Sequence, residues 1–154
     1  MLGQLASTLA LVTALPGPSS EISGTACYDA EVTAKIANQT PSVIPAPDDG
    51  SIIMRWPWFI DLDVQRVRSG QMKRGIVTAL SVQHTYYSSR RKSQRWLLRR
   101  NEQGSFNLLG LAKELTLERC AAGTPPARAF LSSSEPGGME KLRREAEDRY
   151  GRRP

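Results

Sequence analysis

His84 is the one histidine in the sequence, and it follows an apolar run typical of a buried strand. Nucleophilic or acid–base catalysis would need a nucleophile and an orienting carboxylate close to this ring. Ser81, Ser88 and Ser89 are near it in sequence, but no catalytic motif joins them to His84. The sequence therefore predicts a protein that is not an enzyme and has no catalytic residues.

Metal-binding residue types are equally sparse. Asp61 and Asp63 fall on one face of an expected strand, but two carboxylates are too few for a calcium site. Cys27, Cys120 and His84 fall short of the four ligands with local spacing that structural zinc requires. We expect neither a metal nor another cofactor.

The strongest charge cluster is the run SSRRKSQRWLLRR. Its cations could bind an anionic surface, such as a polysaccharide or lipid headgroups, or an acidic protein partner. Arginines around an aromatic ring could also hold single-stranded nucleic acid, although an exported protein rarely meets it. Alternatively the run is a solvated loop with no role, and Trp96, which alternates with Arg95, points into the core. The candidate basic patch is Arg90, Arg91, Lys92, Arg95, Arg99 and Arg100.

A second candidate surface is aromatic. Trp56, Trp58 and Phe59 surround Pro57, which cannot donate to a central strand ladder and so indicates an edge, bulge or bend. An exposed ring there could anchor a partner. The alternative, which the size of the rings favours, is that both indoles cap the open end of a barrel.

The first 26 residues predict export. The run Leu5–Leu15 has the length of the apolar part of a signal peptide, and it ends at Pro16-Gly17-Pro18. Ala14 and Ala26 are candidate cleavage points. No apolar run reaches the ~18 residues of a membrane-spanning helix. We therefore expect residues 1–26 to be a signal peptide and linker, and the protein to be periplasmic or extracellular.

The two cysteines bracket the expected core. In an oxidising compartment, an even pair at the edges of a domain is typical of a disulfide. We therefore predict a bridge between Cys27 and Cys120; the alternative is two unrelated buried thiols.

The pattern between the cysteines is mainly β. Residues 28–36 alternate apolar and polar side chains, and a bulge near Gln65-Arg66 keeps a later strand in phase. Residues 76–84 read as a central strand, and residues 101–104 as a hairpin turn. Hydrophobic residues make up 40% of the chain, which suffices for one core and argues against disorder. We expect a small barrel of five or six strands over residues 27–121.

The composition changes after Ala121. Proline, glycine and serine are frequent up to Gly138, and a charged segment with a narrow apolar stripe follows. The stripe consists of Met139, Leu142, Ala146 and Tyr150. We expect residues 122–154 to be a flexible tail with a charged, solvated helix.

The stretch FIDLDVQRVRSGQMKRGIVTALSV, with Val67-Arg68-Ser69-Gly70 as its turn, resembles the central hairpin of secreted netrin-like domains. This set includes the tissue inhibitors of metalloproteinases and bacterial relatives. The first strand AEVTAKI and the segment WLLRRN…GSFNLL fit the same fold, so the resemblance covers residues 27–120 and implies an OB-type barrel. In the inhibitor branch an N-terminal cysteine chelates the zinc of the target, and cleavage after Ala26 would place Cys27 there. This chain lacks the Cys-x-Cys opening and the further cysteines of those inhibitors.

Together these features predict an exported, non-enzymatic binding or interaction module that engages an anionic surface or an acidic partner. The net charge of +6 agrees with such a partner. The first alternative is a non-exported OB protein that binds single-stranded nucleic acid. The second is an inhibitor of a secreted hydrolase.

Overall fold

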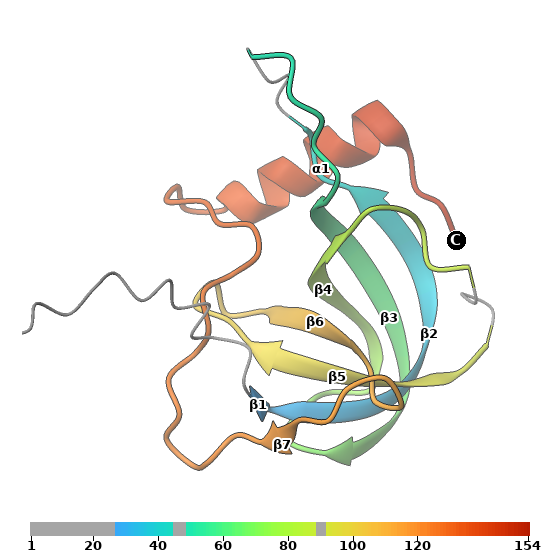
Figure 1. Ribbon diagram of the computed structural model, residues 1–154, viewed down its shortest axis with the longest axis vertical. Coiled ribbons are helices and arrows are strands. Elements are labelled where there is room, and N and C mark those ends of the chain that lie inside the picture. Colours follow the sequence, from blue (N-terminus) through green and yellow to red (C-terminus); the bar gives the residue numbers. More distant parts are fainter. Residues whose placement is uncertain (1–26, 45–48, 89–91) are drawn as a thin grey trace, which may run out of the picture.

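The computed structural model describes residues 27–44, 49–88 and 92–154. The expected signal peptide, residues 1–26, lies outside the described residues. The chain forms strands first and a helix near its C-terminus (Figure 1). In chain order the elements are β1 (Cys27–Tyr28), β2 (Ala30–Pro41), β3 (Trp56–Ser69), β4 (Gly75–Gln83), β5 (Gln94–Arg100), β6 (Phe106–Leu111), β7 (Glu118–Arg119) and α1 (Gly138–Tyr150).

Strands β2 to β6 close into a barrel. Around it the order is β2, β3, β4, β6, β5 and back to β2. Neighbouring strands are antiparallel except β4 and β6, which run parallel. Within the described ranges this is a mainly β, OB-like closed barrel of five strands, as the sequence predicts.

The core follows the period-two alternation of the strands. On β2, Val32, Ala34 and Ile36 are buried, whereas Lys35 is exposed. Side chains at alternate positions of a strand point to opposite faces, so one face of β2 fills the barrel. Opposite these residues the core contains Trp58, Ile60, Leu62, Val64, Ala79, Trp96, Leu98, Leu108 and Leu111.

The predicted bulge is confirmed at Gln65. The adjacent residues Thr33 and Ala34 pair with Arg66 and Val64, which leaves Gln65 as the extra residue of β3. One extra residue restores the alternation, so the valine that follows Arg66 packs against the core.

The disulfide between Cys27 and Cys120 is also confirmed. The Cα atoms of the two cysteines are 4.9 Å apart. The short strands β1 and β7 pair in parallel, and the backbone N–H of Cys120 donates to the carbonyl of Tyr28 at 2.8 Å. This pairing brings the chain after β6 back to the start of β2.

The C-terminal segment differs from the expectation of a solvated, flexible tail. The predicted helix exists as α1, and it lies against the barrel (Figure 1). Three residues of its apolar stripe, Met139, Leu142 and Ala146, belong to one cluster with Phe59 of β3 and Leu80 of β4, on the outer face of these strands. Phe59 and Leu80 are cross-strand partners on that face, so they offer the helix a second, smaller core. This cluster contains Phe59, Leu80, Ala129 and Ala146, with Val43, Phe130, Leu131, Met139 and Leu142 packed against it.

A buried charge network holds the helix in place. Asp61, 1% exposed on the outer face of β3, accepts hydrogen bonds from Arg143 at 2.8 Å and from Thr78 at 2.7 Å. Arg143 also donates to Glu147 at 3.0 Å, and Arg152 lies 3.3 Å from Asp61. Burial acts to lower the pKa of Arg143, but the hydrogen bond that Arg143 donates to Glu147 and the negative charges of Asp61 and Glu147 outweigh it, so the pKa is raised. The guanidinium therefore stays charged and ties α1 to the barrel.

Candidate binding site beside the disulfide

The predicted basic patch does not form one free surface in the part of the chain that the structure describes. Arg90 and Arg91 lie outside the described residues. Lys92 is exposed in the loop before β5. Arg95 is exposed but forms an ion pair with Glu31 of β2 at 2.5 Å. An exposed pair of this kind leaves less charge available to a partner.

Arg99 is an internal residue. It is 3% exposed, and its guanidinium forms an ion pair with Asp29 at 2.5 Å and donates to the carbonyl of Pro125. Its Nε is buried without a hydrogen-bond partner. A buried guanidinium with a carboxylate and a carbonyl as acceptors joins the β1–β2 junction to the segment after β7. Arg99 therefore has a structural role, and its charge is not available to a partner at the surface.

The predicted aromatic surface is mostly inside the protein. Trp58 is 2% exposed, its indole N–H donates to the carbonyl of Gln83, and its ring meets Tyr86 edge-on at 4.6 Å. Trp56 is half-buried and stacks on Trp58 at 5.9 Å. Phe59 lies under α1. The structure therefore places the two indoles at the end of the barrel and the phenyl ring beneath the helix.

His84 lies at the same end of the barrel as the indoles. Its Nδ1 is 2.7 Å from the carbonyl oxygen of Met54, and its ring meets Trp56 edge-on. Asp61 is occupied by arginines, and Asp63 follows it on the same face. Across the described residues, no group of three or more histidine, cysteine or acidic side chains could hold a metal ion. The expectation of a non-enzyme stays a prediction.

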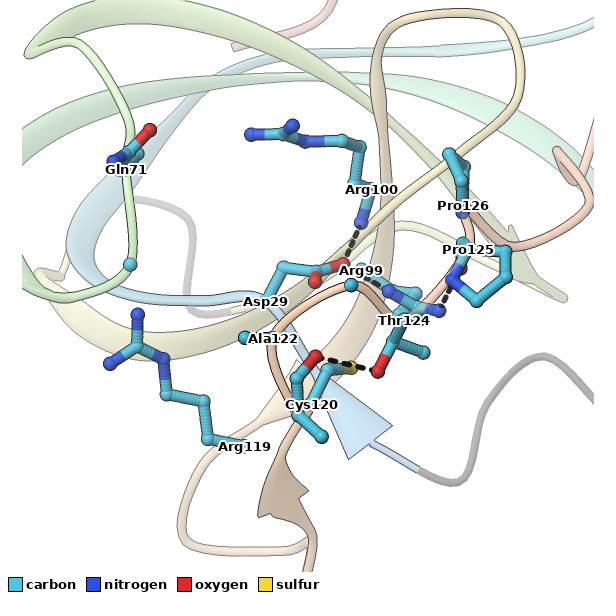
Figure 2. A pocket seen from close by; sticks show the side chains of 13 residues that line it. Asp29, Gln71, Arg99, Arg100, Arg119, Cys120, Ala122, Thr124, Pro125 and Pro126 are labelled. Atoms are coloured by element: carbon cyan, nitrogen blue, oxygen red, sulfur yellow. Dashed lines mark hydrogen bonds and ion pairs between the residues drawn. The ribbon is translucent and has the colours of Figure 1, made fainter.

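An open cavity with a volume of about 510 Å³ lies beside the disulfide (Figure 2). Its walls come from four segments: Asp29, residues 70–71, residues 99–100 and residues 119–126. We call this cavity the cationic cleft, because three arginines and one aspartate line it. Ligand sites are commonly about 300–1,000 Å³, so the cleft has room for more than a bare ion.

Local sequence explains why these segments meet. Gly70, with φ +83°, is the first residue of the turn between β3 and β4, and it lies so close to the β1–β2 junction that a Cβ would be 2.2 Å from the carbonyl oxygen of Asp29. Only glycine fits such an approach at positive φ. On the other wall, Thr124 N–H donates to Ala121 at 3.1 Å, with Gly123 at φ +80°, as in a type II turn.

Two guanidinium groups in the cleft are unpaired. The side chains of Arg100 and Arg119 are exposed and have no hydrogen-bond or ion-pair partner among the described residues. Figure 2 shows them on either side of Asp29, with Gln71 at the far edge. Asp29 already neutralises Arg99, and its Oδ2 also accepts from the backbone N–H of Arg100 at 2.6 Å. The cleft consequently retains about two uncompensated positive charges.

Sequence reasoning found Arg99 and Arg100 but missed four other polar residues of the cleft: Asp29, Gln71, Arg119 and Thr124. The signal for Arg119 was available, because it directly precedes Cys120, which the predicted disulfide brings to the start of the first strand. Asp29 and Gln71 carry no motif, and only the close approach at Gly70 brings them together.

Comparisons with known proteins give no relative: no protein-family profile, no curated protein and no solved structure matches this chain. In the described portion of the chain, no helix is long and apolar enough to cross a membrane.

Proposed function

We propose that this protein is a non-enzymatic interaction module that binds an anionic group of its partner in the cationic cleft. The observation that carries this proposal is the pair of exposed, unpaired guanidinium groups of Arg100 and Arg119 in a cavity of about 510 Å³. Guanidinium groups bind carboxylate, sulfate and phosphate oxygens through charge-assisted hydrogen bonds. The net charge of +6 supports the approach of an anionic partner.

The walls of the cleft support binding without large rearrangement. Arg99 is fixed by Asp29 and by the Pro125 carbonyl, and the backbone N–H of Ala127 donates to the carbonyl of Arg100 at 2.9 Å. The disulfide anchors the start of the wall that residues 119–126 form. Pre-organised walls lower the ordering cost of binding.

Single-stranded nucleic acid is a less suitable partner for two reasons. OB folds bind oligonucleotides on the outer face of their second and third strands, where α1 here covers Phe59 and Leu80. Stacking needs exposed rings, whereas Trp58 and Trp96 are buried in the barrel. Inhibition of a secreted hydrolase stays a prediction that no observation favours.

The proposal includes export to an oxidising compartment and a relation to netrin-like domains. The Cys27–Cys120 disulfide supports the compartment, because such bonds are rare in the cytosol. The OB-like barrel and the Gly70 turn support the relation. The mass of the protein purified from its native cell tests export. Loss of the first 14 or 26 residues is the expected result, and a full-length cytosolic species with free thiols would refute it.

A charge-matched comparison tests the binding function. The cleft variant carries Arg100→Ser and Arg119→Ser; the control carries Arg66→Ser and Arg144→Ser, two exposed arginines elsewhere on β3 and α1. Both variants lose two positive charges, so a general charge effect is the same in each. The probes are inorganic phosphate, poly-L-glutamate and trigalacturonate, titrated by calorimetry at low and high salt.

We expect the cleft variant to bind at least one probe tenfold or more weakly than wild type, with the control within about threefold. Each lost charge-assisted hydrogen bond is worth about 1.5–3 kcal/mol, so two such losses allow this difference. Equal weakening of the two variants, or no binding by wild type to any probe, contradicts the proposal.

A further inference from the structure

The cationic cleft contains a hydrogen-bond acceptor, the Asp29 carboxylate, as well as its arginines. This acceptor limits the classes of ligand that fit the cleft. Asp29 Oδ2 is occupied by Arg99 and by the backbone N–H of Arg100, whereas Oδ1 has no partner in the described structure. The Asp29 side chain keeps 26% of its surface exposed. A carboxylate oxygen only accepts hydrogen bonds, so a ligand that displaces water from Oδ1 must offer it a donor in exchange.

The same carboxylate disfavours ligands that are negative throughout. A second negative charge near Asp29 would be repelled, because like charges interact unfavourably at short range. The ligand that fits therefore has one anionic group for Arg100 and Arg119, with neutral O–H or N–H donors beside it. Repeated phosphates and runs of acidic side chains do not have this arrangement.

The remaining walls are polar or small. Gln71 is exposed at the rim, and its amide can both donate and accept. Apart from the disulfide, the apolar side chains that line the cleft are alanines and prolines, within the described residues. There is accordingly no pocket for a lipid chain or for a large apolar side chain of a peptide, which such ligands use as an anchor.

We propose that the ligand of the cationic cleft is an acidic sugar unit of a polysaccharide. Its carboxylate or sulfate lies between Arg100 and Arg119, one hydroxyl donates to Asp29 Oδ1, and a second hydroxyl pairs with the amide of Gln71. This inference rests on the proposed anion-binding function and adds the ligand class to it.

The test compares ligands of equal charge type in the intact chain. Trigalacturonate and a sulfated disaccharide are the sugar probes, poly-L-glutamate is the acidic peptide probe, and vesicles with anionic phospholipid are the membrane probe. The variant is Gln71→Ala, an exposed residue whose loss leaves the barrel intact, and the control is Gln65→Ala, an exposed glutamine at the β3 bulge.

We expect a sugar probe to bind wild type at least tenfold more tightly, per anionic group, than the peptide or vesicle probe. Gln71→Ala should weaken sugar binding about two- to tenfold, as one lost hydrogen bond implies, and leave peptide and phosphate binding unchanged. Gln65→Ala should leave all binding unchanged.

The variant Asp29→Asn gives a second test, because it should change the affinity for inorganic phosphate and the affinity for the sugar probe in opposite directions. Removing the carboxylate charge should strengthen the binding of inorganic phosphate and weaken the binding of trigalacturonate. If this variant does not fold because Arg99 loses its partner, the result with Gln71→Ala alone decides whether the ligand is an acidic sugar.

The outcomes separate the two proposals. If peptide or vesicles bind as tightly as the sugars, and Gln71→Ala affects none of them, the sugar assignment is overturned while anion binding by the cleft stands. If the Arg100→Ser, Arg119→Ser variant behaves like its charge-matched control with every probe, both proposals are overturned.

Discussion

Removing the guanidinium of Arg143 should destabilise the docking of the C-terminal helix on the barrel. The Arg143→Met variant keeps an unbranched apolar stem but leaves Asp61, which is 1% exposed, without its 2.8 Å partner. Breaking a buried ion pair in this way costs about 3–5 kcal/mol. Arg152 remains 3.3 Å from Asp61, so we expect a loss of about 3 kcal/mol in the free energy of unfolding, at the lower end of that range.

Urea unfolding followed by circular dichroism measures this loss. The control is Arg144→Met, one residue along the helix, exposed and without a partner among the described residues; it should change stability by less than about 0.5 kcal/mol. The double variant Asp61→Asn, Arg143→Met should lose less than the sum of the two single variants, because each single change leaves a buried group unpaired. If Arg143→Met unfolds at the same urea concentration as wild type, the reasoning is refuted. The ion pair then does not hold α1, and the helix is only loosely attached, as the sequence suggested.

Three further changes test the parts that hold the barrel and the cleft. Replacing Cys27 and Cys120 together by serine opens a loop that spans 93 positions, and loop-closure entropy gives a loss of about 4.6 kcal/mol in urea unfolding; a loss below about 1 kcal/mol would contradict this account. Gly70→Ala should cost about 2–4 kcal/mol, from strain plus the collision with the Asp29 carbonyl. Gly104→Ala, with φ +73° but open space, should cost only about 1–2 kcal/mol by the same assay; equal losses would disprove the close approach. Phe59→Ala should cost about 3–5 kcal/mol, and a value near zero would show that α1 does not cover this face.

The barrel was predictable because short-range patterns determine it. Alternation placed Val32, Ala34 and Ile36 on the inner face, and the break in parity predicted a bulge near Gln65-Arg66, which the structure has at Gln65. The disulfide followed from two cysteines at the edges of one domain. Each of these inferences depends on residues that are close in sequence or on a single pair.

The docking of α1 was not predicted, because it depends on the second face of two strands. Phe59 interrupts the polar outer side of β3, and Leu80 lies opposite it on β4. Their side chains were attributed to the aromatic surface and to a central strand. Both assignments ignored that these two apolar side chains point to the outer face of the barrel, where another segment must pack against them to bury them. The narrow stripe of Met139, Leu142 and Ala146 provides that cover.

The candidate site was predictable only in part. The run of arginines drew attention to the end of β5, but strand alternation cannot tell which arginine finds an acid from a distant segment. Asp29 is 70 positions before Arg99 and neutralises it, whereas Arg100 beside it remains unpaired. Long-range pairing of this kind leaves no local pattern in the sequence.

The central claim is that the cationic cleft holds an anion between Arg100 and Arg119. Arginine Nε–Hε resonances, assigned by single substitutions and followed during titration with trigalacturonate, test it most directly. The account predicts saturable shifts at Arg100 and Arg119, with Arg66 and Arg144 unchanged. Equal, non-saturating shifts of all exposed arginines, or no shift at the two cleft residues, would contradict it.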